Sequence, residues 1–226
     1  MNTYQYRCVA SVICGSTNSN AALLTVNTAL AITNQPVNNT VCSSQLSTFS
    51  VTATGTGLSY QWQVSTTGCA GTFVNLTNTA PYSGVLTATL IVNPTSAAMN
   101  NLAYRCVVSG TCAPSVNTNC VVLTVNTPIN IISSPSNTTI CEGLQTTFIV
   151  GVTGTNPSYQ WQESTNGGGT WNNITDGGVY AGATSATLTL TNVPATMSGY
   201  QYMVIVTGAA PCGNATSTAG TLLVNT

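Results

Sequence analysis

Side chains capable of acid–base, metal or thiol chemistry are few in this chain. Only five of its 226 residues are charged, three acids and two arginines, and it contains no lysine and no histidine. Its nine cysteines are the reactive side chains that it has in number. Any chemistry must therefore come from scattered carboxylates or from thiols.

The three acidic residues lie in different segments. Glu142 follows Cys141 in a turn, Glu163 ends a predicted strand, and Asp176 lies in the glycine-rich stretch "TDGG". General acid–base catalysis needs a positioned histidine or a carboxylate of shifted pKa, and a serine or cysteine nucleophile needs a neighbouring base. Calcium sites need several carboxylates on one loop. We therefore expect no enzyme activity, no metal and no cofactor, and we interpret Asp176 as a turn residue.

Charge and hydropathy exclude two further classes of partner. Arg7 and Arg105 are too few to form a phosphate-binding surface, so no nucleic-acid partner is expected. No apolar run approaches the roughly 18 residues of a membrane helix, and the first residues lack the pattern of a signal peptide. We expect no membrane insertion in this segment and an export signal outside it.

The elements that carry these residues repeat along the chain. The tripeptide "VNT" closes Val26–Thr28, Val125–Thr127 and Val224–Thr226, a spacing of 99 residues, and "SYQWQ" recurs at the same spacing from Ser59 and Ser158. The sequence thus predicts two complete repeats, 29–127 and 128–226, preceded by the last part of a third, 1–28. Met1 aligns with Met99 and Met197, so we expect it to be an internal residue of a longer protein.

The hydropathy pattern is that of β-strands. Stretches such as "TFSVTATG" and "YRCVVSG" alternate apolar with small or polar residues, and Gly, Asn, Pro and Ser gather between them. No segment keeps a 3.6-residue period over ten or more positions. Seven to eight short strands in each repeat predict an all-β fold of two-layer sandwiches.

A few framework residues indicate which sandwich this is. Trp62 and Trp161 stand where an immunoglobulin domain buries its strand-C tryptophan, and Tyr104 and Tyr202 stand where strand F carries its tyrosine corner. Cys106 occupies the strand-F cysteine position. Its strand-B counterpart is Val51, and the second repeat has Val150 and Val204, so the usual disulfide between the sheets is not expected. We predict tandem immunoglobulin-like sandwiches in a linear array.

The string "VC…TFSVTATGTGLSYQWQVSTTG…YSGVLTATLIV…YRCVVSGTC…VVLTVN" resembles the immunoglobulin-like repeats of giant secreted surface proteins of Bacteroidetes. That family includes gliding adhesins and grappling-type filaments exported by the type IX pathway. The resemblance covers nearly the whole chain, although "YMV" replaces "YRC" in the last repeat. It implies an extracellular or cell-surface protein of many non-catalytic repeats.

Disulfides are the expected state of cysteines in a secreted chain, and the absence of histidine and of CxxC pairs argues against zinc. The last repeat has Cys141 before strand B and Cys212 in the F–G turn, matching Cys42 and Cys112. The first hypothesis is therefore one bond within each repeat, Cys42–Cys112 and Cys141–Cys212. Its difficulty is that the two turns can lie at opposite ends of a sandwich, whereas bridged Cα atoms lie within about 7 Å.

The alternative is a bond from Cys42 to Cys212, across the domain junction. Cys69 and Cys120 are expected to pair as an extra bridge between adjacent loops, and Cys106 and Cys8 to be buried thiols that act as small hydrophobes.

Two functions follow from these observations. The first is a stiff stalk in a filament or adhesin used for surface attachment, because the repeats join without a Gly/Ser linker. The low charge then predicts homo-oligomers, with parallel copies contacting through polar faces in a filament or bundle. The second is a binding module whose loops recognise a glycan or a cell-surface partner. We favour the stalk, and expect such a ligand to bind elsewhere in the longer protein.

Overall fold

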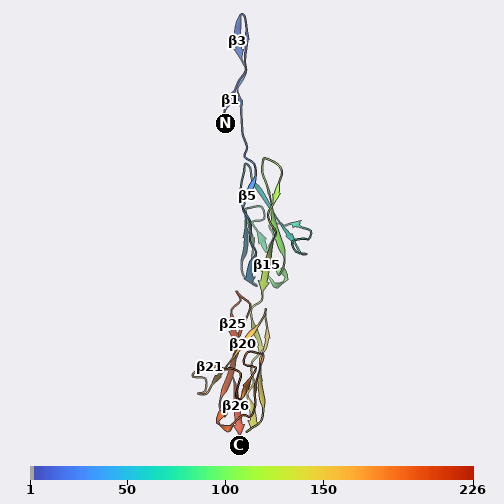
Figure 1. Ribbon diagram of the computed structural model, residues 1–226. Helices are drawn as coiled ribbons and strands as arrows, with labels where there is room; N and C mark the ends of the chain where they lie inside the picture. The colour runs from blue at the N-terminus through green and yellow to red at the C-terminus, as the bar shows by residue number, and fades with distance from the viewer. Residues whose placement is uncertain (1–2) are drawn as a thin grey trace. The chain divides into compact units, whose positions relative to one another are not determined.

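The computed structural model describes residues 3–226, so Met1 lies outside the described residues. The described chain consists of short strands joined by turns, with one three-residue 3-10 helix in each complete repeat, η1 (Ala97–Met99) and η2 (Ala195–Met197). Figure 1 labels some of the strands, among them β5, β15 and β26, and colours the chain from the N-terminus to the C-terminus. The all-β prediction is confirmed.

Residues 3–28 form two antiparallel strand pairs. β1 (Gln5–Tyr6) pairs with β4 (Ala22–Leu23), and β2 (Val9–Val12) pairs with β3 (Gly15–Asn18). Every residue of these four strands is exposed. Cys8 is exposed as well, so the expectation of a buried Cys8 thiol is wrong. The physical reason is that neither hairpin is covered by a second sheet within the described residues.

The repeat 29–127 folds into two facing sheets. The larger sheet has the order β10-β9-β13-β15-β6, with β14 also paired to β13, and its strands are β6 (Asn39–Cys42), β9 (Ser59–Ser65), β10 (Val74–Asn75), β13 (Ala103–Ser109), β14 (Val116–Asn117) and β15 (Val121–Asn126). Facing it are the sheet β11-β12-β7 and the pair β5–β8, with β5 (Ala31–Asn34), β7 (Ser47–Ser50), β8 (Thr52–Thr54), β11 (Tyr82–Ser83) and β12 (Thr89–Val92).

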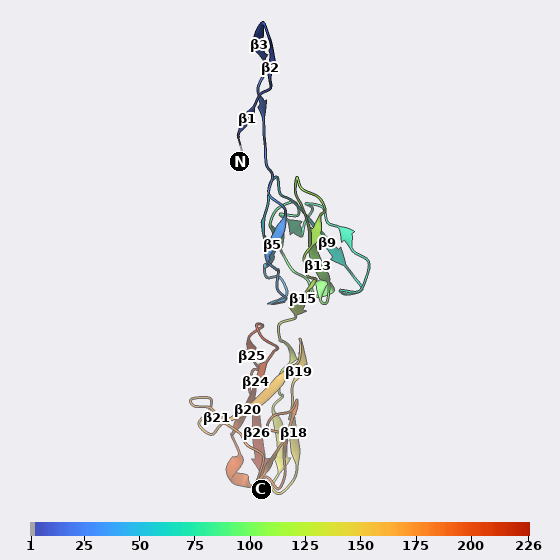
Figure 2. The ribbon, with the colours of Figure 1, turned by 45° about the horizontal axis from the view of Figure 1, so that its top comes forward.

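The repeat 128–226 has the same topology. Its larger sheet has the order β17-β26-β24-β20-β21, with β25 also paired to β24, and its strands are β17 (Thr138–Cys141), β20 (Ser158–Ser164), β21 (Asn172–Asn173), β24 (Gln201–Thr207), β25 (Asn214–Thr216) and β26 (Gly220–Asn225). The facing strands are β16 (Asn130–Ser133), β18 (Thr146–Ile149), β19 (Gly151–Thr153), β22 (Tyr180–Ala181) and β23 (Thr187–Leu190). Figure 2 shows several of these strands from a second direction.

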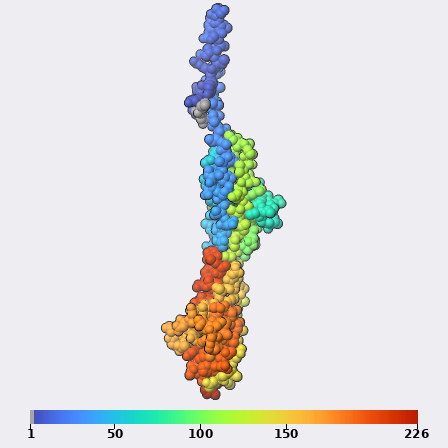
Figure 3. Space-filling view, viewed as in Figure 1, coloured from blue at the N-terminus to red at the C-terminus, as the bar shows by residue number. Residues whose placement is uncertain are grey.

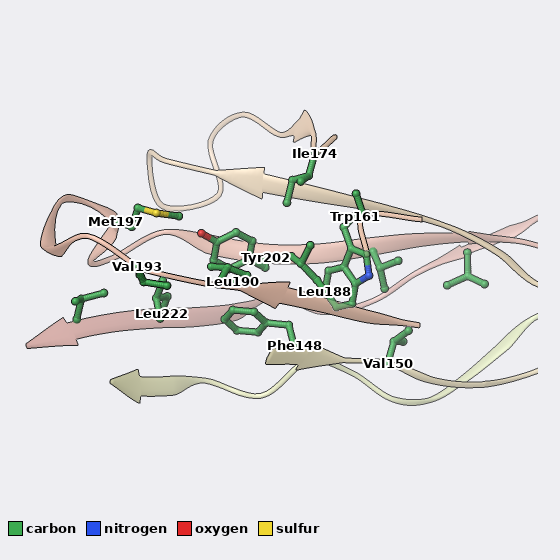
Figure 4. Close-up of a cluster of buried hydrophobic side chains, with 14 residues drawn as sticks. Phe148, Val150, Trp161, Ile174, Leu188, Leu190, Val193, Met197, Tyr202 and Leu222 are labelled. Atoms are coloured by element: carbon green, nitrogen blue, oxygen red, sulfur yellow. The ribbon is translucent and has the colours of Figure 1, made fainter. Parts of the chain in front are cut away.

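Period-2 alternation explains why these segments are strands. In β24 the residues Tyr202, Val204 and Val206 are buried, and the residues between them are only partly covered. Successive side chains of a strand point to opposite faces, so one face joins the core and the other meets solvent. The second repeat's core contains Phe148 and Trp161 among the side chains drawn in Figure 4.

The segment that follows the central strand protrudes in each repeat. It carries β10 in the first repeat and β21 in the second, and Figure 3 shows the former as turquoise atoms standing out from the body of its sandwich. Both strands have two exposed residues, but Leu76 and Ile174, just beyond them, are buried. A single apolar anchor thus ties each protruding segment to its core.

The described chain divides into two compact units whose boundary differs from that of the repeats. The first unit contains the residues up to Asn38, Thr48–Val92 and Leu102–Val122, and the second contains Asn39–Ser47, Asn93–Asn101 and Leu123–Thr226. Every strand pairing nevertheless joins residues of the same repeat, among the residues described. Within residues 3–226 no helix is both long and apolar enough to cross a membrane.

Candidate functional site

Each carboxylate accepts a hydrogen bond that has a local structural role. Asp176 Oδ1 accepts the backbone N–H of Ala183 at 2.7 Å, and Glu142 Oε1 accepts that of Ala195 at 3.1 Å. Glu163 accepts the hydroxyl of Tyr180. Within residues 3–226 no group of three or more metal-ligating side chains comes together.

Arg105 lies on the outer face of β13 beside polar and aromatic neighbours. Its Nε donates to Gln63 Oε1 at 2.7 Å, and its guanidinium lies 4.2 Å from the centre of the Phe73 ring. Such a cation–π contact fixes the arginine over the protruding segment. In the second repeat, Met203 and Trp171 take the corresponding places, so this polar contact is not repeated.

The two framework tryptophans are fully buried. Trp62 Nε1 donates to the carbonyl of Thr87 at 3.0 Å, and Trp161 Nε1 donates to that of Ser185 at 2.8 Å. Both side chains have 0% exposure. A buried indole N–H needs an acceptor, and the turn before β12 or β23 provides one. The tryptophan therefore joins the two sheets by packing and by one hydrogen bond.

Tyr104 and Tyr202 are buried beneath a second tyrosine. The hydroxyl groups of Tyr82 and Tyr104 lie 3.2 Å apart, and those of Tyr180 and Tyr202 lie 3.3 Å apart. The pair thus replaces the usual tyrosine corner, in which the hydroxyl bonds to the backbone. Burial raises the pKa of Tyr104 and of Tyr202 well above 10. The sequence showed Tyr82 and Tyr180 only as turn residues common to both repeats.

Cys106 is a buried free thiol. It has 0% exposure and no disulfide, and burial raises its pKa from 9.0 to about 11. The thiolate is the reactive form of cysteine, so this group is inert at neutral pH. Val204 occupies the same place in the second repeat, which agrees with a packing role.

The described chain contains two disulfides. Cys69 is bonded to Cys120, with Cα atoms 5.6 Å apart, as the sequence led us to expect. Cys42 is bonded to Cys212, with Cα atoms 5.2 Å apart. The second is the alternative pairing, and both of its cysteines belong to the second compact unit.

The pairing of Cys42 with Cys112, and that of Cys141 with Cys212, is wrong. Cys42 lies beside Asn126 of β15, at the end of the sheet where β13 begins. Cys112 follows the last residue of β13, so it lies at the opposite end of the sheet. Roughly ten residues of strand at 3.3 Å each separate the two levels, about 33 Å. A disulfide spans less than about 7 Å between Cα atoms. The second repeat has the same topology, so the same distance separates Cys141 from Cys212.

Strand order explains the Cys69–Cys120 bond. Ala103 lies beside Ser65 of β9 on one side and beside Val122 of β15 on the other. The loop after β9 and the residue before β15 therefore emerge at the same end of the sheet. The second repeat has Ala219 at the place of Cys120 and no cysteine in the corresponding loop, so the bond belongs to the first repeat.

A cavity of ≈ 480 Å³ lies beside the Cys42–Cys212 bond, within the second unit. Its lining residues are uncharged: Val41, Cys42, Gln45, Pro128, Ile129, Pro211, Cys212, Gly213 and Asn214. Such a lining offers no group to neutralise a charged ligand or to transfer a proton.

Cys112 is partly exposed and Cys141 is exposed, both without a disulfide.

The topology and the buried Trp–Tyr framework define a protein of tandem immunoglobulin-like domains. A family model described as a domain of unknown function (DUF8696) matches residues 130–226. No curated protein matches the chain.

Solved structures share this fold at low identity. The titin I-band fragment I67–I69 is 16% identical, with a TM-score of 0.69 over 98% of this chain and 74% of that one. Extracellular domains 3–5 of Drosophila OTK are 19% identical, with a TM-score of 0.61 over 98% and 71%. A chain in the crystal structure of Dpr11 IG1 bound to DIP-gamma IG+IG2 is 15% identical, with a TM-score of 0.55 over 88% of this chain and 100% of that one. At these identities the likeness concerns the fold alone.

Proposed function

We propose that this chain is a non-catalytic structural segment of a large extracellular filament or adhesin. It acts as a stiff stalk and associates with copies of itself in a bundle used for surface attachment. The observation that carries the proposal is the Cys42–Cys212 bond, which ties the two complete repeats together covalently. The segments 1–28, 29–127 and 128–226 are then the successive domains of that stalk.

The distribution of side chains supports a stalk over a catalyst. Both repeats bury the same Trp and Tyr framework, whereas each carboxylate accepts a local structural hydrogen bond. The amide of Asn126 also donates to the carbonyl of Ala210 at 2.7 Å. The Cys42–Cys212 disulfide and this neighbouring hydrogen bond restrict bending between the repeats more than a flexible linker would.

The extracellular location rests on the cysteines and on the family resemblance. Disulfides persist in oxidising compartments, and this chain has two. Export by the type IX pathway of Bacteroidetes agrees with the resemblance to that group's surface repeats. Detection of the protein on intact cells by surface proteolysis or antibody labelling tests this location.

Self-association is supported by the low charge. The net charge is −1, and neither lysine nor histidine is present. Charged residues normally keep sandwich edges apart, and near-zero net charge promotes association. Among the strands at the sheet edges, β10, β11, β21 and β22 have two residues each, and β6, β7, β17 and β18 have four, so each edge offers only a short run of backbone for pairing strand to strand. Contact between polar sheet faces is therefore the proposed mode.

Sedimentation velocity at low and at roughly seawater ionic strength tests this mode. Assembly of the unmodified chain should hardly change with salt, because screening has few charges to act on. The matched variant Thr48→Glu/Thr147→Glu places one carboxylate on an exposed position of each repeat and changes the net charge from −1 to −3. Its assembly should weaken at low salt and recover at high salt. A monomer under every condition would refute self-association.

A ligand-binding module is the second candidate. It is favoured by the incompletely buried rings of Phe73 and Trp171 in the protruding segments, since aromatic rings with exposed faces suit carbohydrate stacking. The immunoglobulin domain of Dpr11 bound to DIP-gamma gives an example of the fold in protein binding. Glycan-array binding that is lost in Trp171→Ala but kept in Trp62→Phe would favour this function over the stalk.

A further inference from the structure

The turns that follow β6 and β17 have the same geometry. Ser43 N donates to Asn126 O at 2.8 Å, and Glu142 N donates to Asn225 O at 2.9 Å. The parallel register sets Cys42 beside Asn126 in the first case and Cys141 beside Asn225 in the second. Cys141 is therefore presented on its backbone in the same way as Cys42.

Hydrogen bonds within the turn are also the same in the two repeats. The N–H of Gln45 donates to the carbonyl of Cys42 at 3.2 Å, and the N–H of Leu144 donates to that of Cys141 at 3.3 Å. Two further bonds, Ser44 N to Thr95 O and Gly143 N to Val193 O, hold each turn to the loop before its 3-10 helix. The cysteine thus sits on a rigid turn in both repeats, and no rearrangement is needed to present Cys141.

The two turns differ in what covers them. Cys42 is bonded to Cys212, and the neighbouring Asn126 is 8% exposed with its amide bonded to the carbonyl of Ala210. In the second repeat, Cys141 and Asn225 are both exposed, and Cys141 has no disulfide. The cysteine and asparagine of this turn are thus bonded and covered in the first repeat, whereas in the second repeat they are exposed.

The chain also shows the partner that such a turn takes. Cys212 lies in the turn between β24 and β25, the F–G turn of the second repeat. Cys112 lies between β13 and β14, and Cys14 lies between β2 and β3. All three repeats therefore carry a cysteine in this turn.

We propose that Cys141 forms a disulfide with the F–G-turn cysteine of another repeat of this type, as Cys42 does with Cys212. Each such repeat would then provide two cysteines, one in the turn that corresponds to Cys42 and Cys141 and one in its F–G turn. A row of repeats would be joined by a disulfide at every junction. The partner is recognised by its fold and by the place of its cysteine. This inference concerns one junction and holds whether or not copies assemble laterally into a bundle.

The bond requires an oxidant of the disulfide class, such as oxidised glutathione. The thiolate of Cys141 attacks one sulfur of that disulfide and releases one thiol, and the partner thiolate then attacks the mixed disulfide and releases a second. The two cysteines lose two electrons and two protons in total. The small disulfide is reduced to two thiols.

The direct test adds a further repeat to the chain. Residues 128–226 are duplicated after Thr226, so that the new junction reads "VNTPIN" as it does at Thr127–Pro128. The extended chain is folded with reduced and oxidised glutathione, alkylated without denaturant, and digested with pepsin for mass spectrometry. Trypsin is unsuitable because the unmodified chain has only two arginines and no lysine.

The expected result is a crosslink between the peptide of Cys141 and the peptide of Cys212, which the unextended chain does not give. The two copies of the Cys141 peptide have the same mass, so their alkylation should fall to half, because only the copy in the duplicate stays free. In the matched extended variant Cys141→Ser, this crosslink should be lost and half of the Cys212 peptide should be alkylated instead.

The Cys42–Cys212 peptide in the same digest is the internal control for folding. If it forms while the Cys141 peptide of both copies stays fully alkylated, the proposal is overturned. If Cys141 pairs instead with Cys112 or Cys14, or if neither junction forms its bond, the pairing rule itself is wrong. Lateral assembly, measured separately by sedimentation, distinguishes failure of this inference from failure of the proposed filament function.

Discussion

The phenolic hydroxyl of Tyr180 donates a hydrogen bond to Glu163, and the same hydroxyl lies 3.3 Å from that of Tyr202. The first repeat has the tyrosine pair without the acid, because Val64 stands at the place of Glu163. A carboxylate on the sheet surface is thereby connected to the most deeply buried tyrosine of the second repeat. Hydrogen bonds to a charged group are stronger than those between neutral groups.

Tyr180→Phe should therefore destabilise the second repeat by about 1–2 kcal/mol, since it leaves the Glu163 carboxylate without its donor. Tyr82→Phe removes only a bond between neutral hydroxyls and should cost about 0.5–1 kcal/mol. Urea unfolding followed by circular dichroism measures both. Equal losses in the two variants would show that the carboxylate adds nothing to the tyrosine pair.

Alkaline pH should destabilise the protein. Burial raises the pKa of Tyr104, Tyr180 and Tyr202 above the usual 10, and in Tyr180 the bond to Glu163 adds to the effect. Below pH 10 these groups keep their protons in both states. Above it the unfolded chain loses protons that the folded chain retains, so the free energy of unfolding falls as pH rises.

The measurement is the urea midpoint at pH 8, 10 and 11. Cys106, whose pKa burial raises to about 11, contributes in the window between 9 and 11. The background variant Cys106→Val removes the contribution of Cys106, and valine is the residue that the second repeat has at this place, Val204. Tyr202→Phe in this background should weaken the dependence above pH 10. A midpoint independent of pH would contradict the raised tyrosine values.

Removing a core tryptophan should cost far more than removing a half-buried one. Trp161→Ala creates a cavity and leaves the carbonyl of Ser185 without its donor, so we expect a loss of about 3–5 kcal/mol. Trp171→Ala, in the protruding segment, should cost about 1 kcal/mol or less. Hydrogen exchange of the amides of β20 and β24 follows the second repeat by itself. Similar losses in the two variants would contradict the assigned core.

Cleavage at arginine distinguishes the disulfide pairings. Trypsin acting on the denatured, unreduced chain cuts after Arg7 and Arg105, and both disulfides join the fragments 8–105 and 106–226. In Cys69→Ser/Cys112→Ser these fragments should stay linked through Cys42–Cys212. In Cys69→Ser/Cys212→Ser they should separate. Separation of the first variant instead would restore the pairing of Cys42 with Cys112.

The repeat, the all-β fold and the buried framework could be predicted from the sequence because they depend on local pattern. Alternation along "SYQWQ" places Trp62 and Trp161 on the face that a two-layer sandwich buries, whatever the other strands do. The lack of histidine, with carboxylates scattered over three segments, likewise argues against the common catalytic groupings from residue types and spacing alone.

Tertiary structure alone decided between the two pairings that the sequence left open for Cys42. Cys42 and Cys112 of the first repeat match Cys141 and Cys212 of the second in sequence. Strand order nevertheless puts the two cysteines of each repeat at opposite ends of its sandwich. Tyr82 and Tyr180 could not be assigned to the core from their turn-like surroundings, since their hydroxyls reach Tyr104 and Tyr202 only after the sheets pack. A disulfide or a buried hydrogen bond is a condition on distance between segments, and no periodicity within a segment encodes it.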